Sequence, residues 1–516
     1  MRLTRRWIVA VAVCLGAILP ASLGRADVRL PRIFSRDMVV QREKPICVWG
    51  WADPGEKVSV KMGDAEQSAT AGDKGEWMVK LPAIPAGGPH KMTITGKNTI
   101  ELANILAGEV WVCSGQSNME MGIGACKEGE KEIAAANYPK IRLFHVESKT
   151  SGTPVNDVVG GWRVCSPGTI AGFGWGGFSG VGYFFGREIH KSLDVPVGLI
   201  DTSWGGTRIE PWTPPEGFAS VPALKDIVNT IEAANRDYPK ACAKALDDIE
   251  AAIPAARKAL AEGKLPGPLP VMPRHPLDNE QRPTGLYNAM VNGIVPFACR
   301  GAIWYQGESN LGEGMLYFEK MKGLISGWRK VWGNDEMAFY YVQLAPYRYG
   351  GDPTRLPGIW EAQTATLSIP NTGMAVTTDI STIGDIHPPN KQEVGRRLAL
   401  WALAKTYGKS DLVYMGPMYK SMAVEGNKIR LTFDNVGGGL ASRDGKDLSW
   451  FEIAGSDKKF VKATATIDGQ TVVVSSDAVA APAAVRFGWH ELAEPNLMNK
   501  EGLPASPFRT DGPERR

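Results

Sequence analysis

The sequence predicts an α/β protein with a mainly parallel central sheet and a β-rich region on either side. From about residue 106 to 408, apolar strand-like runs alternate with helical patterns, which is typical of a parallel sheet covered by helices. Residues 27–105 and 409–516 contain short runs, several of them alternating, separated by Gly, Pro and Asp turn signals. A chain of 516 residues is long enough for such a multidomain arrangement.

The first 26 residues resemble an export signal. Three of the first six residues are arginine, and residues 7–20 form an apolar stretch too short to cross a bilayer. Small residues follow, so we expect cleavage after Ala26. No later segment is apolar for long enough to span a membrane. We therefore expect an exported protein, periplasmic or extracellular, with no membrane span once the leader is removed.

The elements of the mature chain follow from its periodicity. Residues 27–105 predict a small β-sandwich, and residues 409–516 a second β-rich domain. Residues 106–408 predict the α/β domain, which ends in an amphipathic helix from Val394 to Tyr407. Ala, Lys, Glu and Asp recur at helical spacing near residues 222–265, and these residues predict a helical insertion.

Composition argues against several functions. A net charge of +3 is too small to indicate nucleic-acid binding. The chain has no C-x-x-C pair, no HExxH motif and no clustered His and Asp set, so we expect neither a metal nor another cofactor. Cys113 and Cys126 remain a possible disulfide, and the sequence leaves their pairing open.

One stretch, residues 105–120, organises the central domain. Val110 to Cys113 is apolar and predicts a buried strand, the chain breaks at residues 114–117, and residues 118–120 suit the first turn of a helix. This strand-to-helix turn places Ser117 at the carboxyl edge of the sheet, over a helix amino terminus. Backbone N–H groups there favour a developing oxyanion. Ser117 is therefore a candidate nucleophile, although a helix-capping serine would look the same.

A candidate base lies far along the chain. Of six histidines, His387 stands between a predicted terminal strand and a helix. Asp385 lies two residues before it, so one loop delivers an imidazole and a carboxylate that orients it. Asp379, at the end of the preceding strand, is a rival for the orienting role.

Two further loops follow apolar strands. Residues 204–207, Trp-Gly-Gly-Thr, contain glycines that let a backbone N–H approach a ligand. Residues 306–310, Gln-Gly-Glu-Ser-Asn, place amides and a carboxylate at the edge where ligands bind in open sheets.

At these residues the chain resembles the sialate O-acetylesterases, a family within the SGNH-type serine esterases. Four separate blocks carry the resemblance in the right order: residues 115–120, 204–207, 304–310, and 385–388 with Lys391 and 395–398. The resemblance implies a three-layer α/β/α catalytic domain of flavodoxin-like topology, flanked by β-rich domains, that removes O-acetyl groups from sugars.

The resemblance also implies roles for individual residues. Ser117 corresponds to the nucleophile, His387 to the general base and Asp385 to the third member of a triad. Asp385 and His387 are separated by one residue, whereas D-x-x-H is the common spacing, which weakens the assignment of Asp385 more than that of His387. The reaction would pass through an acetyl-enzyme.

The oxyanion and substrate contacts are assigned in the same way. The N–H groups of Ser117 and of a glycine, for which we favour Gly206, correspond to oxyanion donors. Gln306 or Asn310 could provide a further donor, and Gln306 is favoured because it follows its strand directly. The remaining candidates for the oxyanion and substrate set are Gln116 and Glu308.

Other functions stay open at this point. Glu308 with Glu210 or Glu361 could form the carboxylate pair of a glycoside hydrolase, and a non-catalytic carbohydrate-binding protein is a third reading. The acetylated sugar could be sialic acid, or xylan or another plant polysaccharide. Arg208 could pair with a sialic acid carboxylate or form a structural ion pair, and the second is favoured. The sequence does not reveal the oligomeric state.

Overall fold

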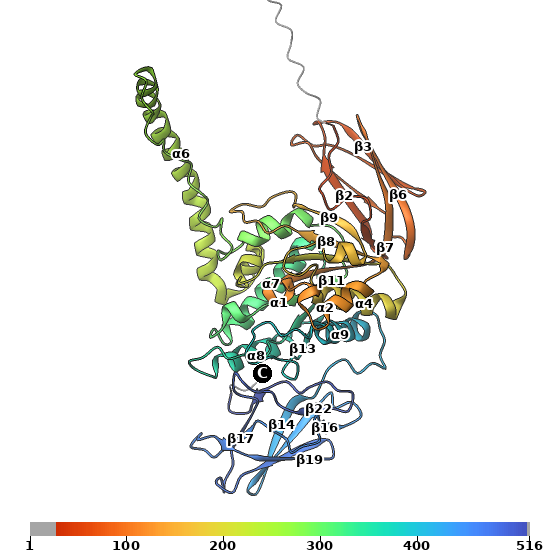
Figure 1. Cartoon of the computed structure of the whole chain (residues 1–516), viewed down its shortest axis with the longest axis vertical. Helices are drawn as coiled ribbons and strands as arrows, with labels where there is room; N and C mark the ends of the chain where they lie inside the picture. The colour runs from red at the N-terminus through yellow and green to blue at the C-terminus, as the bar shows by residue number, and fades with distance from the viewer. Residues whose placement is uncertain (1–26, 513–516) are drawn as a thin grey trace, which may run out of the picture.

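A computed structural model of the chain describes residues 27–512. The predicted leader, residues 1–26, lies outside the described residues. The α/β prediction is confirmed: a central sheet carries helices on both faces, and β-structure precedes and follows it. The N-terminal and C-terminal strands lie at opposite ends of this central unit, and helix α6 projects away from it (Figure 1).

The central sheet has the order β13-β12-β11-β7-β10-β8-β9, and only β9 is antiparallel to its neighbour. Without β8 and β9, the strands β7, β10, β11, β12 and β13 follow the flavodoxin-like order 2-1-3-4-5. The order reverses at β7, where ligands bind in such sheets. The strands are β7 (Thr99–Gly115), β8 (Tyr138–Val146), β9 (Gly160–Cys165), β10 (Val197–Ser203), β11 (Gly301–Tyr305), β12 (Ala338–Val342) and β13 (Thr372–Ala375).

Large aromatic side chains fill both faces of this sheet. Trp111 of β7 meets Phe185 of α4 with ring centroids 4.9 Å apart, and α9 packs beside α4 on that face. Trp304 of β11 meets Trp328 of α7 at 6.5 Å. The helices of the central unit are α1 (Ser117–Glu120), α2 (Gly129–Ala135), α3 (Pro167–Ile170), α4 (Gly180–Leu193), α5 (Pro215–Ala219), α6 (Lys225–Ala261), α7 (Leu316–Trp332), α8 (Arg355–Thr366) and α9 (Lys391–Trp401).

Strand β7 joins the N-terminal β-structure to the central sheet. Its first half pairs with β6 and β1, and its second half pairs with β10 and β11. The domain boundary expected at 105/106 therefore falls inside one continuous strand. The N-terminal strands are β1 (Val39–Gln41), β2 (Ile46–Trp51), β3 (Lys57–Met62), β4 (Ala65–Thr70), β5 (Glu76–Leu81) and β6 (Gly87–Thr95).

The helical segments differ from expectation in detail. The expected insertion is one helix, α6, in which only Ile231 and Ala234 are buried, and it continues through Pro239 and Pro254. The closing helix begins at Lys391, earlier than expected, and ends in a π-helical turn over Ala402–Thr406. Among the described residues, no helix combines the length and the apolar character that crossing a membrane requires.

The C-terminal region has its own hydrophobic core and two four-stranded antiparallel sheets. Arg509 in its last strand forms a bidentate ion pair with Glu361 of α8, at 3.0 and 2.9 Å, which ties this region to the central unit. Its strands are β14 (Met418–Glu425), β15 (Lys428–Asp434), β16 (Leu440–Ser442), β17 (Phe451–Ala454), β18 (Val461–Lys462), β19 (Thr464–Asp468), β20 (Thr471–Ser475), β21 (Ala484–Phe487), β22 (Leu497–Asn499) and β23 (Phe508–Arg509).

We expect Gly115→Ala to destabilise the protein and to impair the site together. Gly115 has φ +140°, and an added Cβ would lie 2.2 Å from the carbonyl oxygen of Tyr305. The strain should cost about 1–3 kcal/mol and lower the midpoint of thermal unfolding. Gly161→Ala is the control, because a Cβ there meets nothing within 4 Å. Equal midpoints for both variants would contradict this account.

Candidate active site

Two loops that are distant in the sequence meet at the carboxyl edge of the sheet. Ser117 is the first residue of α1, directly beyond β7, and His387 lies in the segment between β13 and α9. His387 Nε2 and Ser117 Oγ are 2.8 Å apart, across 270 positions of sequence. The structure thus brings together the two side chains that the sequence singled out as nucleophile and base.

The surroundings of His387 favour the neutral imidazole. Burial lowers the pKa of His387, and the nearby Lys391 ammonium lowers it further, while Asp385 acts in the opposite direction. The exposed Trp175 ring and the imidazole pack in a T-shaped pair, with centroids 4.8 Å apart. A neutral imidazole whose Nε2 accepts from Ser117 carries its proton on Nδ1, as a general base requires.

The structure separates the two carboxylates that competed to orient this imidazole. Asp379 is bound by the buried Arg397 in a bidentate ion pair, at 2.6 and 2.7 Å, and is not free to act on His387. Asp385 Oδ1 accepts the backbone N–H of His387 at 2.9 Å and lies 3.8 Å from Nδ1. Asp385 is thus near the imidazole but does not form a close side-chain hydrogen bond with it. Arg397, although charged, faces the interior from the helix that was expected to be amphipathic.

A buried amide ties the two loops together. Asn118 Nδ2 donates to the carbonyl oxygen of Ile386 at 2.9 Å and to Glu308 Oε1 at 2.6 Å. Its Oδ1 accepts from the Lys391 ammonium, which can only donate and therefore fixes the orientation of the amide. Ile386 directly precedes His387, and Asn118 directly follows Ser117. The hydrogen bond between them therefore holds the loop of His387 beside the loop of Ser117.

The charges around Asn118 are strongly perturbed. Burial lowers the pKa of Lys391 to about 8. Burial raises the pKa of Glu308, although Asn118 and Lys391 act against this. Glu308 Oε2 is buried and has no hydrogen-bond partner among the described residues. Glu308 stays a predicted substrate contact, and its Oε1 accepts from Asn118.

The glycine loop lies directly against Ser117. A Cβ added at Gly205 would lie 3.2 Å from the Cβ of Ser117. The Gly205 N–H donates to Glu120 Oε2 at 2.6 Å, so this amide is not available to a ligand. In residues 27–512, the N–H groups of Ser117 and Gly206 donate to no protein acceptor. Gly206 has φ +73°, a conformation that glycine adopts without strain.

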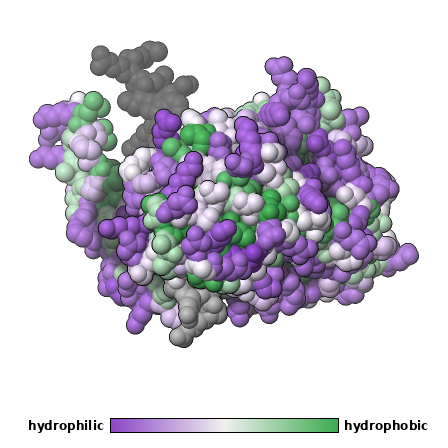
Figure 2. Space-filling view, turned by 90° about the horizontal axis from the view of Figure 1, so that it is seen from below, coloured by the Kyte–Doolittle hydropathy of each residue, from purple (hydrophilic) through white to green (hydrophobic). Residues whose placement is uncertain are grey.

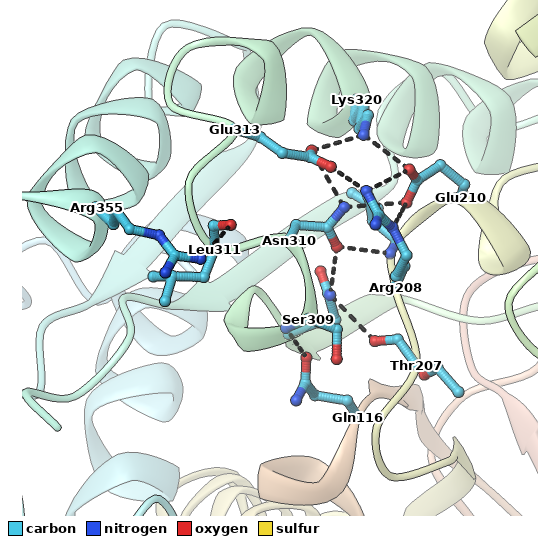
Figure 3. A network of polar contacts seen from close by, with 12 residues as sticks. Gln116, Thr207, Arg208, Glu210, Ser309, Asn310, Leu311, Glu313, Lys320 and Arg355 are labelled. Atoms are coloured by element: carbon cyan, nitrogen blue, oxygen red, sulfur yellow. Dashed lines mark hydrogen bonds and ion pairs between the residues drawn. The ribbon is translucent and has the colours of Figure 1, made fainter. Parts of the chain in front are cut away.

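The amides after β11 have other partners. Gln306 Nε2 donates to Thr207 O at 3.2 Å and to Asn310 Oδ1 at 2.7 Å. Asn310 Nδ2 donates to Glu210 at 3.0 Å and to Glu313 at 3.2 Å. Both N–H groups of each amide are therefore used, which corrects the expectation that Gln306 or Asn310 donates to the oxyanion. Figure 3 shows Asn310 at the centre of this network, which fixes the glycine loop to the strand beside it.

The same network engages Arg208 and Glu210. Arg208 pairs with Glu313 and Glu210, as a structural ion pair would. Burial acts to raise the pKa of Glu210, but Lys320, at 2.7 Å, holds it below its ordinary value. Glu361 pairs with Arg509. Neither Glu210 nor Glu361 is thus a free carboxylate that could work with Glu308 in a glycosidase.

Gln116 also has a supporting position. Its Oε1 accepts the backbone N–H groups of Gly307 and Ser309, each at 3.3 Å, and so joins the ends of β7 and β11. Cys113 and Cys126, the possible disulfide, are both free thiols. Within residues 27–512, no group of three or more His, Cys, Asp or Glu side chains is placed to hold a metal ion.

Comparison with known proteins adds independent evidence. The family model described as "Carbohydrate esterase, sialic acid-specific acetylesterase" matches residues 107–246 and 276–404, more than half of the chain. The chain belongs to this family. Membership makes the protein an esterase that acts on carbohydrates, a carbohydrate O-acetylesterase.

Individual relatives agree with this assignment. The sialate O-acetylesterase of Rattus norvegicus is 30% identical, over 88% of both chains. The human sialate O-acetylesterase is 28% identical, over 97% of both chains. A crystal structure of a carbohydrate acetylesterase from Xanthomonas citri is 36% identical with a TM-score of 0.78, covering 94% of this chain and 100% of that one. The match to the Xanthomonas citri structure covers nearly the whole chain, including most of its flanking β-structure.

Sequence reasoning assigned no role to Asn118 or Lys391, although both lie in blocks that carry the family resemblance. Their positions one residue after Ser117 and four residues after His387 were the available signal. Only the folded chain reveals that the two side chains touch.

We expect the pH dependence of the reaction rate to show that activity requires His387 in its neutral form. The base must be unprotonated, so activity should fall as the pH drops through the pKa of His387, below the ordinary value of 6.5. Asp385 raises this pKa, so Asp385→Asn should move the acidic limb to lower pH. Asp379→Asn is the comparison: it breaks a buried ion pair and should lower thermal stability without the same shift. An unchanged limb in Asp385→Asn would contradict the assignment.

We expect Asn118→Ala to reduce kcat by about tenfold to a hundredfold with little effect on KM, because the loop that carries His387 loses its hydrogen bond from Asn118. Organophosphonate labelling of Ser117 should slow in parallel. Asn229→Ala, which removes an exposed amide on helix α6, is the matched control. A folded Asn118→Ala protein with the kcat of the wild type would show that the amide does not position His387.

Proposed function

We propose that the protein is an exported sialate O-acetylesterase that hydrolyses acetyl esters through Ser117, His387 and Asp385. The observation that carries this proposal is the 2.8 Å contact between Ser117 Oγ and His387 Nε2 at the carboxyl edge of the sheet. A hydroxyl hydrogen-bonded to a neutral imidazole is the pair that acyl transfer needs.

The reaction would run in two steps. His387 Nε2 takes the proton of Ser117 as Oγ attacks the acetyl carbonyl, and the N–H groups of Ser117 and Gly206 stabilise the oxyanion. The imidazolium then protonates the departing sugar oxygen, which leaves an acetyl-enzyme. Water, deprotonated by His387, attacks this ester and releases acetate. Asp385, half exposed and 3.8 Å from Nδ1, contributes a favourable charge to the imidazolium.

Export is supported by the sequence of the first 26 residues alone. The basic start, the short apolar stretch and the small residues before Ala26 are typical of a signal peptide. An exported enzyme would meet O-acetylated sugars in the periplasm or outside the cell.

The choice of sugar rests on the relatives. The mammalian relatives are named sialate O-acetylesterases, which supports acetylated sialic acid as the substrate. The Xanthomonas citri relative, at 36% identity, is named only a carbohydrate acetylesterase, so acetylated xylan or another plant polysaccharide is the second candidate. Arg208 already pairs with Glu210 and Glu313, which favours its structural role over recognition of a sialic acid carboxylate. Acetate release from both substrates, measured side by side, decides between them.

We expect Ser117→Ala to lose at least about a thousandfold of acetate release without unfolding. Ser309→Ala, in the neighbouring loop, is the control and should keep activity. Glu308→Gln tests the glycosidase alternative, which requires that it abolish activity while Ser117→Ala spares it. Full acetate release by Ser117→Ala would refute the nucleophile assignment.

A further inference from the structure

The C-terminal region contains a cavity of about 660 Å³ that the catalytic site does not use. Loops before β17 and after β21, together with β18 and β19, form its walls. Figure 2 looks onto this end of the molecule and shows hydrophobic residues gathered among polar ones. The residues that matter for recognition are Asp447, Trp450, Glu452, Lys462, Trp489 and His490.

Trp450 has an unusual backbone. Its φ is +63°, and its side chain is 39% exposed. A bulky residue in the left-handed region is strained by about 1 kcal/mol or more, and such strain persists only where the surroundings enforce it. The Gly488 N–H donates to the Trp450 carbonyl oxygen at 2.9 Å and helps to hold this conformation. The molecule thus keeps a large aromatic ring partly in solvent where glycine would fit without strain.

The loop that carries Trp450 is fixed before any ligand arrives. The buried Asn496 accepts the backbone N–H of Ser449 at 3.0 Å and donates to the carbonyl oxygen of Asp447 at 2.9 Å. Trp489 is held from behind by the Arg509 guanidinium, 5.1 Å from its ring centroid. A rigid aromatic surface loses little conformational entropy when a ligand stacks on it.

The polar groups around these rings are available. His490 Nδ1 accepts the Leu492 N–H at 3.1 Å, so a neutral imidazole carries its proton on Nε2 and can donate there. The side chains of Asp447, Glu452 and Lys462 form no hydrogen bond or ion pair within residues 27–512. Two carboxylates and one ammonium disfavour a phosphate and suit neutral hydroxyl groups, which both donate and accept.

We propose that this cavity binds neutral pyranose units of a glycan chain, with Trp450 stacking on a sugar face. Aromatic rings beside a few polar groups are the chemistry that recognises sugars. The inference rests on the proposed function only in taking a glycan as the natural ligand. The cavity would keep the enzyme on a polymeric substrate while acetyl groups are removed at Ser117.

The test uses Trp450→Gly, because glycine removes the ring and also relieves the backbone strain. We expect the variant to remain folded, because the relieved strain offsets part of the lost ring packing, while its affinity for xylohexaose and cellohexaose, measured by calorimetry, falls about tenfold or more. Val424→Ala, at an exposed position of β14, is the control and should bind as the wild type does. Hydrolysis of the small ester 4-nitrophenyl acetate should be unchanged in both variants.

Two results would overturn the proposal: wild-type affinity in a folded Trp450→Gly protein, or no binding of either hexasaccharide by the wild type. The result of this binding test does not depend on whether the esterase proposal is correct. If Ser117→Ala retained acetate release, the nucleophile would be wrong while oligosaccharide binding at Trp450 could still be measured.

Discussion

The candidate active site depends on one buried amide that binds three groups. Asn118 contacts the carbonyl oxygen of Ile386, the carboxyl group of Glu308 and the ammonium of Lys391. Glu308 follows β11, whereas Ile386 and Lys391 follow β13, so the amide, which itself follows β7, fixes loops that the sheet alone would leave independent. Buried polar groups that are satisfied specify a single arrangement, because any other arrangement leaves them unpaired.

The hydrogen bond from Asn118 explains how a serine–histidine site can form although Asp385 makes no close hydrogen bond to the imidazole. In a tight triad the carboxylate both orients the imidazole and stabilises its charge. Here the orientation is supplied through the backbone beside His387, and Asp385 is left with an electrostatic contribution from 3.8 Å. The buried Lys391 lowers the pKa of His387 at the same time. One cluster therefore both tethers the loop that carries His387 and lowers the pKa of its imidazole.

A second buried network supports the glycine loop. Gln306 and Asn310 bind the loop backbone and its neighbours, while Arg208 and Lys320 neutralise Glu210 and Glu313. These residue types suggested substrate contacts when only the sequence was considered. A carboxylate or an amide after a strand serves equally well as scaffold, and only its partners distinguish the two uses.

The sequence by itself determined the α/β class, the β-rich flanks and the candidates Ser117 and His387. Strand periodicity and the position of polar residues after apolar runs are local properties of the sequence, so they can be recognised without knowledge of the fold. Only the tertiary structure decided that β7 crosses the expected domain boundary, that Asp379 belongs to Arg397, and that Asn118 meets Lys391. Such pairings depend on which side chains the packed sheet and helices bring within hydrogen-bond reach. The number of residues between two positions does not determine the distance between their side chains in the fold.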